Sequence, residues 1–199
     1  MKKISFIHFE QVDSTNKWVK RNYQNLSSDQ ITCVIADLQT EGIGTRQRKW
    51  ISPKGNLYVS LFFTLPKNCL FLPHLAQFAS FCAALALRKL GFNPNIKWPN
   101  DLILSSKKVG GILAEIVELP EAKGVILGVG LNLNMSTEDL AHIDQPATSL
   151  KQESGTNWAV DRVLLEFLEQ FKKAYPRFAE EGFTPFVEEF EALLTVRPN

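Results

Sequence analysis

Residues 42–54, with the sequence GIGTRQRKWISPK, combine features that suit a nucleotide ligand. Gly42 and Gly44 let the backbone approach a ligand closely, and the aromatic face of Trp50 could stack on a nucleobase. Arginine guanidinium groups match the geometry of phosphate oxygens. The segment contains no acid and four cations, namely Arg46, Arg48, Lys49 and Lys54. This composition favours an anionic, phosphate-bearing ligand.

A second basic cluster lies near the middle of the chain. Lys97 precedes WPND, and Lys107 and Lys108 precede the pair Gly110-Gly111. Together the two clusters predict an electrostatic cradle for a polyphosphate. On composition alone, a solvated surface loop that happens to be basic is an equally good interpretation.

Several other chemistries lack their sequence patterns. There is no GxSxG, GxxxxGK[ST] or HExxH, and His8, His74 and His142 are far apart in sequence. Two GxG pairs occur, but Gln47 and Leu133 stand where a GxGxxG motif has its third glycine. A nucleophilic triad and a dinucleotide-binding fold are therefore disfavoured.

The composition is that of an ordinary globular protein. The 199 residues include 22 Lys or Arg and 21 Asp or Glu, and the resulting formal charge of +1 argues against a general nucleic-acid binder. Cys33, Cys69 and Cys82 form no CxxC pair, so we expect neither a disulfide scaffold nor a zinc finger. No signal peptide or membrane span is expected from the apolar runs. We therefore expect a single domain in the cytoplasm.

Hydrophobic patterning predicts the elements that must position these residues. The predicted strands are 4–9, 31–39, 56–65, two within 96–119 joined at Ser105–Lys108, and 124–135. The predicted helices are 15–23, 74–90, 160–175 and 184–194, the first capped by Asp13 or Ser14. This order favours the α+β class, with a mixed, mostly antiparallel sheet and helices packed on one face.

Six segments occur in an order that is typical of one family. They are VDSTN (12–16), LQTEGIGTRQRKW (38–50), NLYVSL (56–61), KWPNDL (97–102), KKVGGILAE (107–115) and GVGLNLN (128–134). Each segment alone is weak, whereas KWPND followed closely by KVGGILAE and then GVGLNLN is specific. Across nearly its whole length the sequence resembles the biotin protein ligase family, which implies a biotin/lipoate protein ligase-like fold.

The resemblance also implies a two-step reaction. Biotin first reacts with ATP, releases pyrophosphate and gives biotinyl-5′-AMP; the biotinyl group then passes to one lysine of the biotin carboxyl carrier domain of a carboxylase. Carboxylate and triphosphate are both anions, so this reaction needs positive charge and positioning more than a protein nucleophile. Mg²⁺ is expected to arrive with ATP and to be held mostly by its phosphates, without a protein metal site.

Residue roles follow from the same resemblance. Lys108 would lie beside the biotin carboxylate and the α-phosphate, Arg48 would bind phosphate, and Asp101 would accept a hydrogen bond or proton from the incoming lysine; these are the expected catalytic residues. The expected biotin-binding residues are Ser14, Thr15, Asn16, Gln39, Gly44, Lys108 and Gly111. The expected ATP- and adenylate-binding residues are Arg46, Arg48, Trp50 (against the adenine), Asn100, Lys108 and Asn132.

Purely structural roles stay open at some of these positions. Ser14 could serve only as a helix cap, and Asp101 could be a turn carboxylate that organises its loop. Lys97 and Trp98 are interpreted as supports under the pocket, without a direct role.

The glycine-rich loop departs from the family pattern GRGRxGRxW. Ile43 and Thr45 replace two arginines, and Gln47 replaces a glycine. Each lost charged hydrogen bond should weaken the hold on the adenylate by roughly 1.5–3 kcal/mol. We therefore hypothesise that biotinyl-5′-AMP escapes and labels nearby amines, unless Lys49 or Lys54 compensates.

Length bounds the expected organisation. Many family members carry an N-terminal helix-turn-helix domain and a small C-terminal β-rich domain. Residues 1–199 are expected to be the catalytic domain alone, with the SH3-like C-terminal domain absent or truncated after about residue 195. A homodimer is possible through an exposed sheet edge, for which 56–65 and 124–134 are the candidates; no nucleic-acid or membrane partner is expected.

Three functions are compatible with the sequence. An active biotin ligase is favoured, because Lys108 and Asp101 are retained. Ile43, Thr45 and Gln47 suggest as an alternative a degenerate biotin- or adenylate-binding module without transfer activity. The third is a lipoate or octanoate transferase of related fold, against which KWPND and KVGGILAE argue.

Overall fold

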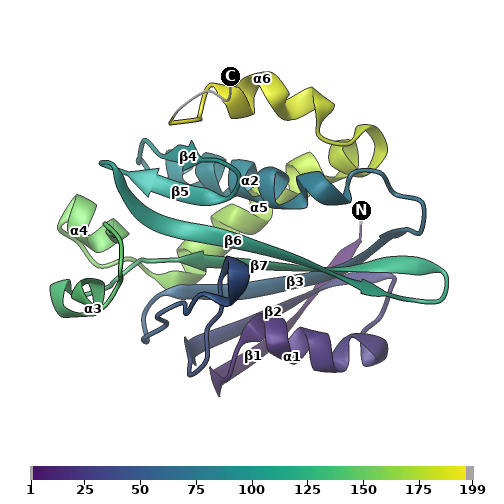
Figure 1. Cartoon of the computed structure of the whole chain (residues 1–199), viewed down its shortest axis with the longest axis horizontal. Helices are drawn as coiled ribbons and strands as arrows, with labels where there is room; N and C mark the ends of the chain where they lie inside the picture. Colours follow the sequence, from purple (N-terminus) through teal and green to yellow (C-terminus); the bar gives the residue numbers. More distant parts are fainter. Residues whose placement is uncertain (1, 196–199) are drawn as a thin grey trace.

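The computed structural model describes residues 2–195, which form a seven-stranded sheet (Figure 1). The strand order is β1-β2-β3-β7-β6-β5-β4. The strands are β1 (Lys3–Val12), β2 (Gln30–Gln39), β3 (Leu57–Pro66), β4 (Asn95–Lys97), β5 (Asp101–Leu104), β6 (Lys107–Glu118) and β7 (Ala122–Leu131). Strand β1 runs parallel to β2, and the other neighbouring pairs are antiparallel. The mixed, mostly antiparallel sheet of the α+β prediction is confirmed.

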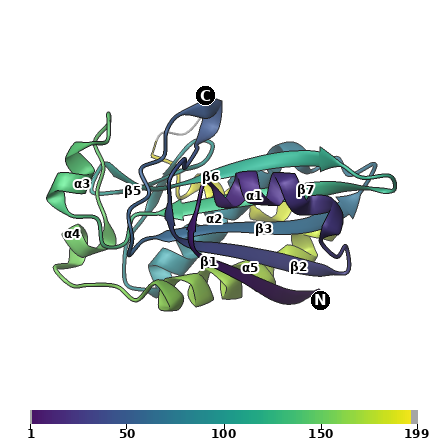
Figure 2. The same cartoon turned by 90° about the horizontal axis from the view of Figure 1, so that it is seen from below.

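Helices cover both faces of this sheet. The α-helices are α1 (Thr15–Asn22), α2 (Leu75–Lys89), α3 (Thr137–Ala141), α4 (Leu150–Ser154), α5 (Val160–Glu181) and α6 (Val187–Glu191). The long helices α2 and α5 pack on one face, where Leu61 of β3 joins their main core. The next residue, Phe62, points the other way and joins Val19 of α1 in a second, smaller cluster. Figure 2 shows α1 on the face turned away from α2 and α5, an addition to the predicted one-sided packing.

Several element boundaries differ from prediction, and two of the differences involve a proline. Helix α5 continues past residue 175 and through Pro176, because Phe178 beyond it is fully buried and stacks on Phe78 at 4.1 Å between ring centroids. That packing offsets the cost of a proline inside a helix. The first strand predicted within 96–119 is divided into β4 and β5 by a turn at residues 98–100, where the Trp98–Pro99 peptide is cis.

The strands proposed as dimer edges are interior. Strand β3 pairs with β2 and β7, and β7 pairs with β3 and β6, so neither has a free edge. That prediction is wrong because apolar content reports burial, which both interior and edge strands can have. The two edges of the sheet belong to β1 and β4.

The cysteines are free thiols, and Cys33 and Cys82 are buried in the core. Burial raises the pKa of the Cys33 thiol to about 12. Within residues 2–195, no helix is both long and apolar enough to cross a membrane. Residues 196–199, where a C-terminal domain is expected to start, lie outside the described part of the chain.

Candidate active site

The floor of the candidate site is a row of glycines on the face of the sheet that α1 covers. Gly111 of β6 pairs with Asp101 on one side and with Gly130 of β7 on the other. A side chain at Gly130 would meet the Trp50 ring at 2.8 Å, and one at Gly128 would meet Asn16 Oδ1 at 2.4 Å. Glycine is therefore required at both positions for Trp50 and Asn16 to lie directly on the sheet.

Two pockets open above this floor. The first, about 490 Å³ including its mouth, lies between α1, the loop of residues 42–54 (the basic loop) and the sheet. Its lining includes Ser14, Thr15, Asn16, Gln39, Ile43, Gly44, Tyr58, Gly111 and Gly128. The second, about 1540 Å³ including the open solvent at its mouth, lies between the basic loop and the segment that connects α3 to α4. Its lining includes Arg48, Lys49, Ile51, Asn132, His142, Asp144 and Gln145.

The two pockets meet at a shared group of residues. Six residues line both, namely Gly44, Thr45, Trp50, Asn100, Asp101 and Lys108. Lys108 Nζ lies 2.6 Å from Asp101 Oδ1, and both side chains are largely buried. The same ammonium lies 5.4 Å from the centre of the Trp50 ring. A cation, a carboxylate and an aromatic face therefore stand where a ligand in one pocket would meet a ligand in the other.

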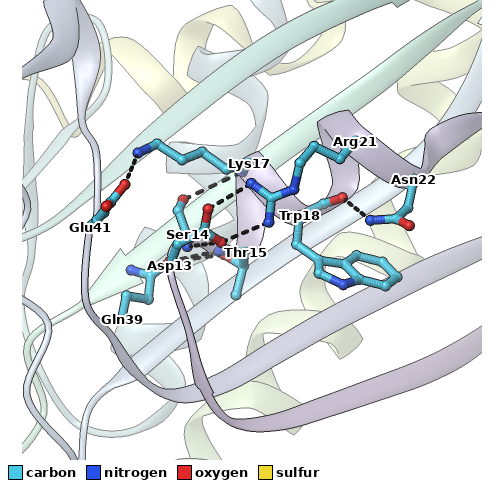
Figure 3. Close-up of polar contacts among 9 residues, drawn as sticks. All are labelled: Asp13, Ser14, Thr15, Lys17, Trp18, Arg21, Asn22, Gln39 and Glu41. Atoms are coloured by element: carbon cyan, nitrogen blue, oxygen red, sulfur yellow. Dashed lines mark hydrogen bonds and ion pairs between the residues drawn. The ribbon is translucent and has the colours of Figure 1, made fainter.

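The N-terminus of α1 is held firmly at the first pocket (Figure 3). Ser14 caps the helix, since its Oγ accepts a hydrogen bond from the Lys17 backbone N–H. Asp13 receives two hydrogen bonds from the Arg21 guanidinium, at 2.6 and 2.9 Å, which hold the pKa of that carboxyl below its ordinary value. These contacts fix the chain on both sides of Thr15, which lies on the pocket wall.

Gln39 joins α1 to the basic loop. Its Oε1 accepts from the Thr15 backbone N–H at 2.9 Å, and its Nε2 donates to Ser52 Oγ at 3.0 Å. Ser52 Oγ donates in turn to the Trp50 carbonyl at 3.0 Å. The end of β2 therefore sets the distance between the two walls of the first pocket.

Behind the pocket wall, a second chain of polar contacts leads away from Asn16. Asn16 Oδ1 lies 2.5 Å from Ser60 Oγ, and Ser60 Oγ lies 2.7 Å from Thr15 Oγ1. Asn16 Nδ2 donates to Glu115 at 3.1 Å, and Glu115 forms an ion pair with Lys20 at 3.0 Å. Ser60 is fully buried, and the sequence predictions include neither Ser60 nor Glu115.

In the second pocket, Asn132 and Asn100 have different hydrogen-bonding states. Asn132 Nδ2 donates to the Thr148 carbonyl at 3.1 Å, whereas its buried Oδ1 has no protein partner among residues 2–195. Asn100 Nδ2 donates to the Ile112 carbonyl at 2.6 Å, which ties the turn after β4 to β6. Asn132 therefore has an acceptor free for a ligand, while Asn100 is also a structural anchor.

Comparison with known proteins agrees with this geometry. Residues 8–132 match the family model described as "Biotin/lipoate A/B protein ligase family". The chain belongs to this family. It is 34% identical over 188 residues to the biotin–[acetyl-CoA-carboxylase] ligase of Paracoccus denitrificans, covering 88% of this chain and 75% of the relative.

Other members of the family are similar over most of the chain. The bifunctional ligase/repressor BirA of Escherichia coli is 33% identical over 185 residues, which cover 92% of this chain and 57% of BirA. The biotin protein ligase of Aquifex aeolicus, solved in complex with biotin and ATP, superposes with a TM-score of 0.81 at 32% identity, covering 96% of this chain and 78% of that one. The biotin ligase-like fold is confirmed. The chain spans little more than half the length of several curated relatives.

Most of the residues matched to the family pattern come together. The exception is Arg46, which is exposed at the tip of the basic loop and lines neither pocket. The loop closes on itself, because Gly44 N–H donates to the Arg48 carbonyl at 2.7 Å and Trp50 N–H to the Gly42 carbonyl at 2.8 Å. Loop closure therefore directs Arg48, rather than Arg46, to the second pocket.

Trp98 does not lie under the pocket. Its side chain is 59% exposed, and the adjacent Lys97 is exposed as well. The interpretation of both residues as supports is wrong, because the end of β4 and the turn that follows it leave both side chains exposed. The Asn100 anchor described above is the support that this turn provides.

Several pocket residues are absent from the sequence predictions. Tyr58 lines the first pocket, and its hydroxyl donates to the Pro53 carbonyl at 2.9 Å. His142, Asp144 and Gln145 form one wall of the second pocket. No local pattern marks the latter group, since its segment reaches the site only through the fold.

Proposed function

We propose that this chain is an ATP-dependent ligase that activates biotin as biotinyl-5′-AMP and transfers it to a lysine of a biotin carboxyl carrier domain. The observation that carries the proposal is the meeting of the two pockets at Lys108 and Asp101. One pocket takes biotin and the other takes ATP. The similarity to the Paracoccus ligase and to the Aquifex enzyme bound to biotin and ATP supports both assignments.

In the first step, the biotin carboxylate attacks the α-phosphorus of ATP and pyrophosphate leaves. Lys108 offsets the repulsion between the two anions and stabilises the charge that develops at the phosphorus. Arg48 binds phosphate oxygens, and Trp50 and Asn132 contact the adenine side of the nucleotide. The free Oδ1 of Asn132 accepts a hydrogen bond there.

In the second step, the amine of the carrier lysine attacks the biotinyl carbonyl and AMP leaves. The amine must lose a proton, and Asp101 accepts it. Asp101 Oδ1 forms an ion pair with Lys108 Nζ at 2.6 Å. When the adenylate phosphate takes over Lys108, the Asp101 carboxylate becomes available for the incoming amine.

The remaining partners follow from this reaction. Mg²⁺ would enter with ATP and would be held mostly by its phosphates. The three free thiols are compatible with a reducing cytoplasm. For a homodimer, the outer edge of β1 is the available pairing surface, because Ile96 of β4 is already hydrogen-bonded to Leu193 and Thr195.

The test combines the protein with biotin, MgATP and a biotin carboxyl carrier domain. We expect pyrophosphate release and a carrier that binds streptavidin. Biotin binding with neither product would support a degenerate binding module instead. Labelling of the carrier by lipoate but not by biotin would support the lipoate alternative.

A further inference from the structure

The polar chain behind the biotin pocket ends in a charged residue that does not line the pocket itself. Glu115 lies on β6, with 20% of its side chain exposed, and contacts Asn16 through Oε2 and Lys20 through Oε1. We propose that Glu115 is a positioning residue, which fixes the hydrogen-bonding polarity of Asn16, Ser60 and Thr15 so that the pocket presents acceptors to an N–H group of a cyclic urea. This inference rests on the proposed binding of biotin.

The carboxylate first fixes the orientation of the Asn16 amide. An ionised carboxylate can only accept hydrogen bonds, so the amide NH₂ of Asn16 must face Glu115. The amide oxygen then faces Ser60, at 2.5 Å. The orientation of an asparagine amide is determined by its hydrogen-bond partners rather than by its shape. Here Glu115 is the partner that determines it.

The orientation of Asn16 then fixes the next two protons. Ser60 has a single hydroxyl proton, and the Asn16 oxygen can only accept, so Ser60 donates to Asn16. Thr15 must therefore donate its own proton to Ser60, at 2.7 Å. Since that proton is used, the 3.3 Å contact between Thr15 Oγ1 and Gln39 Oε1 joins two acceptors.

The result is a pocket wall with a defined chemical character. Thr15 Oγ1 keeps free lone pairs, and Gln39 Oε1, which receives the Thr15 backbone N–H, keeps one as well. These two acceptors lie 3.3 Å apart and therefore converge on one N–H donor of a ring urea, whose two N–H bonds point away from each other. They disfavour a ring that carries an acceptor at that position. Glu115 therefore contributes to substrate selection through Asn16 and Ser60, without touching the ligand.

Replacement of Glu115 by glutamine removes this control with little change in shape. A glutamine amide can donate to the Asn16 oxygen, which allows Asn16, Ser60 and Thr15 to reverse their donors and acceptors together. The Thr15 hydroxyl would then donate toward the pocket. The reversed chain would accept a ligand whose ring presents an oxygen in place of one N–H.

The experiment compares Glu115→Gln and Ser60→Ala with Glu118→Gln. Glu118 lies on the same strand and forms its own ion pair with Lys123, so its replacement is a matched control. The probes are biotin and its cyclic carbamate analogue, in which oxygen replaces one ureido N–H. Binding constants come from equilibrium titration, KM and kcat from biotin-dependent exchange of pyrophosphate into ATP, and folding from thermal unfolding.

We expect Glu115→Gln and Ser60→Ala each to raise the Kd and KM for biotin about ten-fold, with kcat and the KM for ATP unchanged within two-fold. Glu115→Gln should also reduce the preference for biotin over the carbamate, while Glu118→Gln matches the parent. A folded Glu115→Gln protein with the parent's Kd for biotin and the parent's preference for biotin over the carbamate would overturn the inference. The contact between Glu115 and Lys20 would then be only a surface ion pair. If Glu115→Gln fails to fold, parental biotin binding by Ser60→Ala overturns it. Failure of the parent to bind biotin would refute the proposed function itself.

Discussion

A methyl group added at Gly128 should damage biotin binding through Asn16. The new Cβ would lie 2.4 Å from Asn16 Oδ1 and about 3 Å from the other two atoms of the amide. The β7 backbone cannot easily retreat, because Gly128 pairs with Ser60 on one side and with Leu113 on the other. We therefore expect Gly128→Ala to push the Asn16 side chain out of its position.

The size of the effect follows from the contacts that Asn16 would lose. It makes a neutral hydrogen bond with Ser60 and a charged one with Glu115, at 2.5 and 3.1 Å. Such bonds contribute about 0.5–1.5 and 1.5–3 kcal/mol respectively. If at least about 2 kcal/mol of this sum falls on the biotin complex, the Kd for biotin rises about 30-fold.

Titration of biotin into four proteins tests this reasoning as a double-mutant cycle. The proteins are the parent, Gly128→Ala, Asn16→Ala and the double variant. Because the clash needs the Asn16 amide, Gly128→Ala should cost little further affinity once Asn16 is alanine. Gly124→Ala is the steric control: its Cβ would meet Val117 at 2.6 Å, so it should lower stability and leave the Kd unchanged. An equal loss of affinity from Gly128→Ala in both backgrounds would refute the mechanism.

Three further outcomes are expected. Lys108→Met should lower the rate of adenylate formation roughly 10²–10³-fold in pyrophosphate exchange, because it removes the charge at the junction of the pockets; a rate near the parent's would exclude that role. Thr45→Arg should reduce labelling of a bystander protein by escaped adenylate, and unchanged labelling would reject the retention hypothesis. Arg21 lowers the pKa of Asp13 in the folded protein. The ion pair therefore stabilises the fold at pH values above 3.8, the ordinary pKa of this carboxyl, and this stabilisation is lost as the pH falls through the lower pKa of the folded state. The free energy of unfolding, measured in urea, should therefore be higher for the parent than for Arg21→Met at neutral pH. This difference should become smaller in acid.

The main elements of the fold could be predicted because hydrophobic periodicity is strong in them. Residues 31–39 and 56–65 are strands as expected, and the amphipathic helix after residue 160 is present. What failed depends on contacts between distant elements. Pro176 stays inside a helix because Phe178 stacks on α2, and strands β3 and β7 are interior because of how the sheet is ordered. Neither fact is encoded in a local window.

The site shows the same division between local pattern and tertiary arrangement. Segments with an ordered set of motifs, such as WPND and KVGG, contain Asp101 and Lys108, and the sheet brings the two together. Ser60 lies inside an apolar strand, and Glu115 is the last residue of the KKVGGILAE segment, where the sequence indicates no role for it. Their contribution becomes visible only when β3, β6 and α1 are placed next to one another.

In the altered loop, the substitutions Ile43, Thr45 and Gln47 can be judged against the positions of these residues in the structure. Thr45 lines both pockets and Ile43 the first, so both positions at which the expected family pattern has arginine lie at the site itself. Arg46 cannot fill them from the exposed tip, whereas Lys49 lines the second pocket and Lys54 lines neither. Any compensation for the lost cations should therefore come from Lys49 on the nucleotide side. The first pocket has no such substitute in its lining beyond Lys108, which also pairs with Asp101, so weak retention should concern the adenylate phosphate where the two pockets meet.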